Sequence, residues 1–275
     1  MNVTLKLLSA SLLTVALAGV TSAEDLFFNG QDTTESKNQN FGNKIYGYAL
    51  NWTNALGEAK SPASGDIAYV SVNKSMSCGG GTGVALGGFI IRNNTQAINQ
   101  GTLYLQCGGL GYVEQDNNRS RPFYGTLYAS GSGVLPVMIP SGSSLNVQVQ
   151  INGDSGAIIE KRGMGTLQLI DTSNWASATR SGLSSFVIKA GQVGWRPTGN
   201  GGNLNLKIQT FPANHTLVFA DDGSAGDTGC SFHIGARDVD MINLTLREEP
   251  TVPNPKHILT TSNSTNVYLR MSGTP

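Results

Sequence analysis

The tetrapeptide Gly153-Asp154-Ser155-Gly156 is the first motif in this sequence with residue types that could do chemistry. It copies the centre of the trypsin-type serine motif, in which a histidine base and a buried carboxylate must be brought to the serine. The three histidines of the chain all lie downstream of it, at His215, His233 and His257. Trypsin-type proteases place the histidine and the aspartate upstream of the serine. A glycine-rich hairpin turn explains the motif without catalysis, and we predict such a turn.

A second motif, residues 221–227, gathers Asp221, Asp222 and Asp227 among glycines. Calcium prefers oxygen ligands on a flexible loop, but the spacing fits no EF-hand and lacks its terminal glutamate. We predict a solvated turn here and leave calcium binding open. His215 and His233 with Cys230 match no zinc spacing. The sequence therefore predicts no metal site and no cofactor.

Carboxylates for general acid–base catalysis would have to come from Glu114, Asp116 and Glu160, which are scattered among turn residues. No pair of them has the arrangement that acid–base chemistry needs. We therefore predict a protein without catalytic residues, one that is not an enzyme.

Aromatic and cationic side chains stand together in the two longest polar segments. Trp175 and Arg180 lie in residues 171–182, and Trp195 and Arg196 lie in residues 191–202, which we interpret as a long surface loop. Planar rings stack on sugar faces, and guanidinium groups donate fixed forks of hydrogen bonds. These four residues are our candidate ligand-binding residues for a glycan. The alternative is that both tryptophans cap the core under their own loops.

The three cysteines suggest one disulfide. Cys78 and Cys107 stand outside two apolar, strand-like runs joined by a polar turn, and two adjacent strands would bring them within bonding range. Cys78–Cys107 is the favoured pair because the two lie close in sequence, which leaves Cys230 free and buried. Two alternatives stay open: Cys230 bonds to another molecule, or the Cys78–Cys107 assignment is wrong.

The N-terminus indicates export. Lys6, an apolar run over residues 7–20 and the small residues 21–23 form a secretory signal peptide, residues 1–23, too short for an ordinary transmembrane helix. No second long apolar run follows, so we expect no membrane span after cleavage. The full chain has 18 basic and 18 acidic residues, so loss of Lys6 leaves a net charge of 17 − 18 = −1. That balance gives no reason to expect nucleic acid as a partner.

The composition indicates an all-β fold. The chain has 35 glycines and only 13% charged residues, and short β-branched and aromatic runs alternate with Gly, Asn, Ser and Asp turns. We predict an antiparallel β-sandwich over residues 24–275, one large sandwich or two packed ones divided near residues 131–144. The triplet Gly-Thr-Leu recurs at 101, 125 and 165, with spacings of 24 and 40, so no fixed period supports a solenoid. A β-helix is the minor alternative.

Residues 70–110 add a resemblance to a family. Ser77-Cys78, the run Val84-Ala85-Leu86-Gly87 and the strand at 102–106 ending on Cys107 resemble subunits and adhesins of bacterial chaperone–usher fimbriae. The resemblance implies an immunoglobulin-like sandwich that lacks its last strand. It also implies two kinds of partner, a periplasmic chaperone and then neighbouring fimbrial subunits, which supply that strand by β-strand addition.

Together these observations predict a non-enzymatic fimbrial subunit or tip adhesin. It would pass through the periplasm to the cell surface and mediate adhesion, with host glycan as a candidate ligand. The alternative function is a free secreted carbohydrate-binding β-sandwich.

Overall fold

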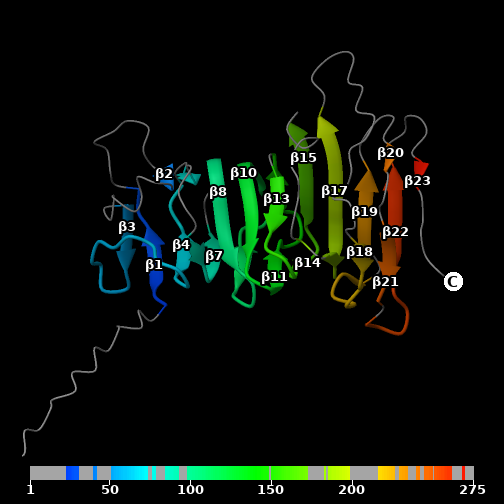
Figure 1. Ribbon diagram of the computed structural model, residues 1–275, viewed down its shortest axis with the longest axis horizontal. Helices are drawn as coiled ribbons and strands as arrows, with labels where there is room; N and C mark the ends of the chain where they lie inside the picture. The colour runs from blue at the N-terminus through cyan, green and yellow to red at the C-terminus, as the bar shows by residue number, and fades with distance from the viewer. Residues whose placement is uncertain are drawn as a thin grey trace, which may run out of the picture.

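Two long sheets make up most of the computed structural model, and apart from β3 the strands along each sheet follow one another in chain order along one axis (Figure 1). The residues that the structure describes are 23–30, 40–41, 51–73, 76–78, 84–92, 98–148, 150–172, 183, 185–198, 216–226, 229–234, 240–241, 245–249, 251–261 and 268–269. Among them, no helix is long and apolar enough to cross a bilayer. The expected signal peptide lies outside the described residues except for its last residue, Ala23.

The first sheet, sheet A, has ten strands in a continuous order. From one edge to the other they are β21 (Thr245–Glu248), β18 (Thr216–Phe219), β16 (Ser185–Ile188), β14 (Ala157–Arg162), β11 (Gly133–Met138), β9 (Gly111–Glu114), β7 (Gly88–Ile91), β4 (Ile67–Val70), β1 (Asp25–Phe28) and β3 (Trp52–Asn54).

The second sheet, sheet B, faces sheet A and follows the same axis. Its order is β2 (Asn40–Phe41), β5 (Met76–Cys78), β8 (Ile98–Gln106), β10 (Ser120–Ser130), β12 (Ser144–Val147), β15 (Thr166–Thr172), β17 (Gly191–Thr198), β19 (Cys230–Ile234) and β22 (His257–Thr261). Two short strands join it at the side, β13 (Gln150–Gly153) on β10 and β6 (Ala85–Leu86) on β8. A separate pair consists of β20 (Asp240–Met241) and β23 (Tyr268–Leu269).

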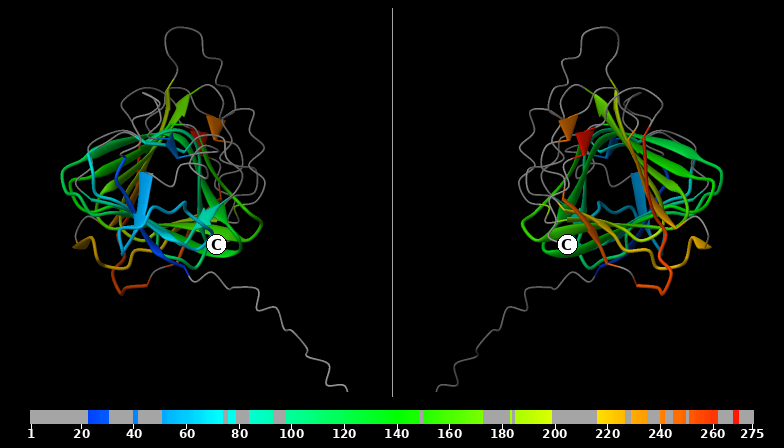
Figure 2. Two further views of the ribbon diagram at one scale, coloured as in Figure 1. Left: turned by 90° about the vertical axis from the view of Figure 1, so that its left-hand side faces the viewer. Right: turned by 90° about the vertical axis from the view of Figure 1, so that its right-hand side faces the viewer.

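The chain forms a β-solenoid, because it passes alternately from sheet A to sheet B and each strand lies beside the strand one coil earlier. Along sheet A, Tyr69 pairs with Ile90 and Ile90 pairs with Val113, always in parallel. Along sheet B, Leu103 pairs with Leu127 in the same way. Viewed along the axis, the two sheets enclose a narrow interior (Figure 2).

The prediction of an antiparallel sandwich is therefore wrong, although the all-β character is confirmed. The strand pairs of the two sheets are parallel except for β1 with β3, where Phe28 opposes Trp52. Alternation of apolar and polar residues identifies a half-buried strand, but it does not state the direction of the neighbouring strand. The region 131–144, where a division into two sandwiches was considered, contains β11, which pairs with both β9 and β14.

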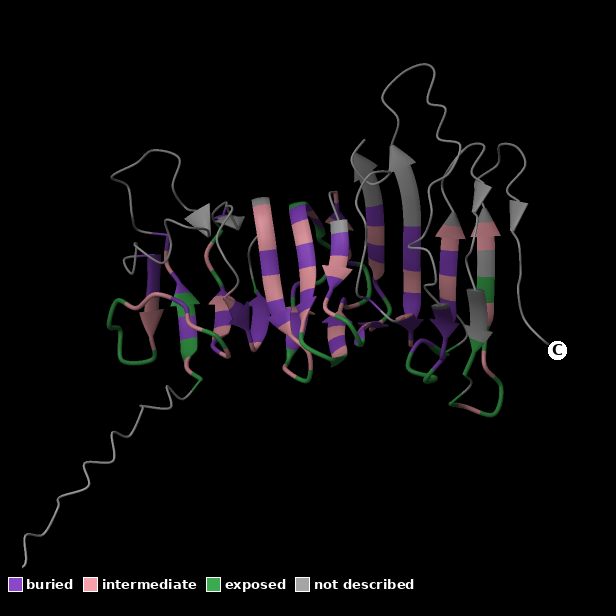
Figure 3. Cartoon of the chain, in the orientation of Figure 1, coloured by how far each residue is buried: buried purple, intermediate pink, exposed green. Residues whose placement is uncertain are grey.

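The interior is built from columns of stacked apolar side chains. One column of sheet B runs through Phe123, Val147 and Leu169, all nearly fully buried and paired in register through β10, β12 and β15. Figure 3 shows the same alternation as bands of buried and less buried residues along each strand. Because successive residues of a strand point to opposite faces, the residues between these columns form the outer faces of the sheets.

Glycine allows the corners of successive coils to stack closely. Gly191 has φ +68°, and a Cβ there would lie 2.6 Å from the carbonyl oxygens of Gly163 and Gly165 in the preceding coil. At Gly229 (φ +55°) a Cβ would lie 2.2 Å from the carbonyl oxygen of Lys256 in the following coil. A side chain at either position would separate the coils, which explains much of the glycine content.

The predicted Cys78–Cys107 disulfide is not formed in this structure, in which Cys107 has a free thiol. The register gives the reason: Cys78 pairs with Gly101 near the start of β8. Cys107 comes six residues further along, roughly 20 Å away at about 3.3 Å per residue. A disulfide requires Cα atoms less than about 7 Å apart. Cys230 is free and fully buried, as expected.

We predict that the free thiols differ sharply in reactivity. Burial, followed by the charge of Asp221, raises the pKa of Cys230 to about 12, so almost no reactive thiolate forms at neutral pH. Iodoacetamide should modify half-exposed Cys107 in the native protein, and Cys230 only after denaturation. Mass spectrometry of non-reduced peptides measures both. Recovery of a linked Cys78–Cys107 peptide would contradict the structure.

Candidate functional site

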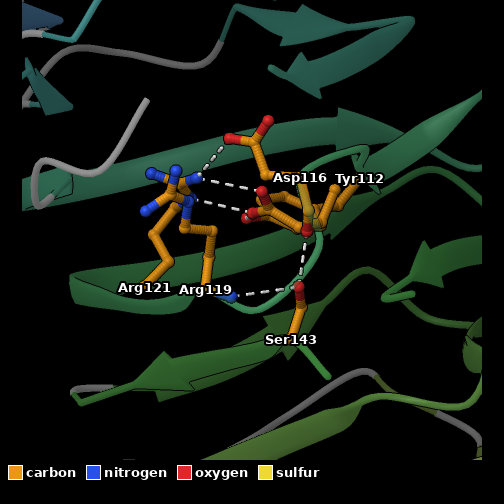
Figure 4. A network of polar contacts seen from close by, with 6 residues as sticks. Tyr112, Asp116, Arg119, Arg121 and Ser143 are labelled. Carbon is orange, nitrogen blue, oxygen red and sulfur yellow. Dashed lines mark hydrogen bonds and ion pairs between the residues drawn. The ribbon is translucent and has the colours of Figure 1, made fainter. Parts of the chain in front are cut away.

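Charged side chains meet inside the solenoid where β9 leads into β10 (Figure 4). The Arg121 guanidinium donates to both Glu114 carboxylate oxygens, from Nε at 2.8 Å and from Nη2 at 2.9 Å. Nη2 also lies 3.2 Å from Asp116 Oδ2. Tyr112 donates its hydroxyl to Glu114 over 3.0 Å, and Ser143 donates to the Asp116 carbonyl over 2.5 Å.

This network is closed off from solvent, as expected of a structural ion cluster. Arg121 and Tyr112 are each only 1% exposed and Glu114 is 2% exposed. Burial, then the neighbouring charge of Glu114, raises the pKa of Tyr112 well above its usual value. For Arg121 burial acts to lower the pKa, but the hydrogen bond and charge of Glu114 outweigh it and the pKa is raised. The two carboxylates thus neutralise one internal cation.

Glu114, Asp116 and Glu160 were placed among turn residues from the sequence, and that interpretation was wrong for Glu114 and Glu160, which lie in β9 and β14. Glu114 ends a sheet A strand and Arg121 lies at the start of a sheet B strand, so only residues between them form the corner. Both side chains occupy inward positions. The signal in the sequence is that Glu114 and Arg121, which carry opposite charges, are seven residues apart. This separation predicts an ion pair only if the two residues are known to lie on consecutive strands of a coil.

The outer face of sheet B carries a ladder of uncharged polar side chains, which we call the polar ladder. Its members form two groups of rows in register. Across β8 and β10, Thr102 stands opposite Thr126 and Tyr104 opposite Tyr128. Across β12, β15, β17 and β19, one row runs through Ser144, Thr166, Gln192 and Ser231, and another through Asn146 and Gln168. All its members are partly exposed: Thr102, Tyr104, Thr126, Tyr128, Ser144, Asn146, Thr166, Gln168, Gln192 and Ser231.

Two tyrosines form the aromatic part of the polar ladder. Tyr104 and Tyr128 stand opposite each other in register, with ring centroids 4.9 Å apart and planes tilted by 49°. Tyr128 donates its hydroxyl to Asp154 Oδ1 over 2.5 Å. This bond, with burial, raises the pKa of Tyr128 to about 12. The aromatic pair is therefore fixed in orientation at the surface.

Asp154 of the serine-protease-like tetrapeptide is the anchor of that tyrosine. Its second oxygen accepts from the Gly131 N–H at 2.6 Å and from Ser130 Oγ at 3.4 Å. The Gly131 hydrogen bond, followed by that of Tyr128, lowers the pKa of Asp154. The predicted turn is present, but it joins β13 of sheet B to β14 of sheet A and is not a hairpin.

Of the four candidate glycan residues, the structure places two. Trp175 and Arg180 lie outside the described residues. Trp195 and Arg196 belong to strand β17, so the interpretation of 191–202 as a surface loop was wrong for residues 191–198, and residues 199–202 lie outside the described part of the chain. The register places Trp195 between Leu169 and Ile234 of the neighbouring strands.

The residues that were considered for a metal site make protein contacts where the structure describes them. Asp221 is buried, and its carboxylate accepts from the Gly223 and Lys256 N–H groups at 3.0 and 2.9 Å. His233 Nδ1 lies 2.8 Å from Thr260 Oγ1. Within the described residues, no three His, Cys, Asp or Glu side chains are arranged to hold a metal ion. His215 and Asp227 lie outside those residues.

Comparison of the chain with protein-family models, with curated proteins and with solved structures finds no match.

Proposed function

We propose that this protein is an exported, non-enzymatic surface protein that binds glycan chains along the polar ladder of sheet B. The observation that carries this proposal is the Tyr104–Tyr128 pair on the outer face of sheet B, together with rows of uncharged hydrogen-bonding side chains that stack in register through β12, β15, β17 and β19 on the same face. A glycan presents hydroxyl groups at its edges and apolar patches on its ring faces. The polar ladder offers both kinds of partner on one face of the sheet, with a regular spacing of about 4.8 Å between coils.

Cell adhesion would follow from display of this surface outside the cell, as the signal-peptide prediction implies. The free carbohydrate-binding protein remains the alternative, now on a solenoid scaffold. Assembly with a periplasmic chaperone and fimbrial subunits stays an untested prediction. Its structural premise was a sandwich with a missing strand, and the solenoid pairs its strands with those of its own neighbouring coils.

The aromatic pair gives the test of this proposal. Replacing Tyr128→Ala should weaken binding of a glycan found on an array by about 1–3 kcal/mol, roughly 5- to 150-fold, because a stacked ring is lost. Tyr128→Phe keeps the ring and should bind nearly as the parent does. Calorimetric titration of the folded variants measures both.

Tyr69→Ala is the matched control, since Tyr69 stacks on Phe27 on the outer face of sheet A, with centroids 5.2 Å apart. Its glycan affinity should be unchanged. Equal affinity of Tyr128→Ala and the parent would show that the polar ladder is not the binding surface.

A further inference from the structure

A pocket of about 660 Å³ opens at the corner where the chain leaves sheet A. It lies apart from the polar ladder, so a ligand site in this pocket is independent of the proposed function. Its walls are Met138, Glu160, Arg162, Gly163, Met164, Lys189, Asp222, Ser224 and Thr251.

Successive coils build this pocket through backbone contacts. Arg162 stands beside Met138 in register. The Lys189 N–H donates to the Lys161 carbonyl at 2.9 Å, and the Asp222 N–H donates to the Lys189 carbonyl at 3.0 Å. The pocket side chains are therefore held at the spacing of the coils, as rigid elements should hold a binding site.

The pocket contains two cations with unused donors. Arg162 donates from Nε to Glu160 Oε1 at 2.5 Å, and this pair leaves its terminal guanidinium nitrogens available. In the part of the chain that the structure describes, the Lys189 ammonium makes no hydrogen bond or ion pair. Glu160 is already neutralised by Arg162, so a ligand meets mainly the Lys189 ammonium and the guanidinium edge.

Acceptors and apolar surface lie beside the cations. Asp222 uses Oδ1 to accept the Ser224 N–H at 2.9 Å and is otherwise exposed, so its second oxygen faces solvent. Met164 is 46% exposed and contributes apolar surface to the same pocket. The site thus combines a carboxylate-binding edge, a hydroxyl acceptor and an apolar wall.

We propose that this pocket binds a carboxylated sugar residue. The carboxylate pairs with Arg162 and Lys189, a hydroxyl of the sugar donates to Asp222, and the apolar ring face lies on Met164. A neutral sugar would leave the Lys189 ammonium unpaired and the terminal guanidinium nitrogens of Arg162 unused, and a simple carboxylic acid would leave Asp222 unused. Charge-assisted hydrogen bonds are the stronger ones, so the carboxylate should dominate affinity.

The experiment is a titration of the mature chain, with ¹³C-labelled methionine methyl groups, against methyl glucuronide and methyl glucoside, which differ by one carboxylate. The methyl signals of Met138 and Met164 should shift with glucuronide, while that of Met76, 1% exposed in the core, should not. Glucoside should bind at least tenfold more weakly. Cyclohexanecarboxylate, which has the charge without hydroxyls, should also bind at least tenfold more weakly.

Variants assign the effect to the pocket. Lys189→Gln should weaken glucuronide binding at least tenfold. Lys60→Gln makes the same charge change at the other end of the solenoid, where Lys60 pairs with Glu24, and should bind as the parent does. Equal shifts with glucoside or cyclohexanecarboxylate, no shift at all, or an unchanged affinity of folded Lys189→Gln would each overturn the proposal.

Discussion

Replacing Arg121→Leu should lower the free energy of unfolding by about 3–5 kcal/mol, because it leaves the buried carboxylates of Glu114 and Asp116 without their cation. The position itself accepts leucine: it pairs with Leu145, which in turn pairs with Leu167, in one interior column of sheet B. Lost packing therefore cannot account for a deficit of this size. Urea unfolding followed by circular dichroism measures it.

The matched control removes the charges along with their partner. In the triple variant Arg121→Leu, Glu114→Gln and Asp116→Asn, the two amides keep the shapes of the carboxylates and no charge is buried. Replacing a whole buried ion group in this way is often close to neutral. It should recover most of the lost stability. If the single and triple variants were equally unstable, the buried charges would not be the cause.

The sequence predicts strands well in this protein but not their partners. Residues 145–151 alternate cleanly, and most of them lie in β12 and β13. The alternation predicts which residues of a strand are buried, and Leu145 and Val147 are indeed fully buried. A sandwich and a two-sided solenoid require the same alternation, so this pattern could not separate them.

The solenoid could not be predicted from a sequence repeat because its coils differ in length. The coil from Tyr69 to Ile90 has 90 − 69 = 21 residues, whereas that from Val187 to Val218 has 218 − 187 = 31. Corners of different length absorb the difference, since only the strands must stay in register. A search for a fixed period therefore fails.

The Gly-Thr-Leu triplets illustrate why the repeat could not be recognised from the sequence. Those at 101 and 125 are stacked one coil apart, with Thr102 opposite Thr126. The triplet at 165 belongs to another column, in which Thr166 stands opposite Ser144. The spacing between the first two triplets thus equals the length of one coil, whereas the spacing to the third triplet does not correspond to a whole number of coils.

The candidate sites were missed for a related reason. The polar ladder and the corner pocket each gather residues from several coils, so their members are about 20–30 residues apart in sequence. Thr102 and Thr126 of the polar ladder, for example, are neighbours only through the pairing of β8 with β10. Asp154 was noticed as part of a protease-like motif, while its partner Tyr128 lies one coil earlier.

The protein should become more stable relative to a Lys161→Met variant as pH rises from 7 to 10.5. Lys161 is fully buried in an inward column between Val137 and Ile188. Its ammonium donates to the carbonyls of Arg162, Gly163 and Ala190 at 2.9, 2.6 and 3.1 Å. Burial, only partly opposed by the charge of Asp222, lowers its pKa from 10.5 to about 7.

The sign follows from proton binding. Between pH 7 and 10.5 the unfolded chain keeps the Lys161 proton and the folded protein has lost it, so stability rises with pH in this window. A pKa lowered from 10.5 to about 7 corresponds to a rise on the order of 3–5 kcal/mol. Below pH 7 Lys161 is protonated in both the folded and the unfolded state, so its contribution to stability no longer changes with pH. The Met variant has no titrating group there, so its difference from the parent isolates Lys161.

The buried thiol of Cys230 acts in the opposite direction and makes the variant comparison necessary. Its pKa is raised to about 12, so above the usual thiol pKa the unfolded chain loses this proton first and stability falls. Both proteins contain Cys230, and its effect cancels in their difference. Urea unfolding of parent and Lys161→Met at pH 6, 7, 8, 9 and 10 gives that difference at each pH. A difference that stays constant from pH 7 to 10 would show that Lys161 keeps its proton in the folded protein.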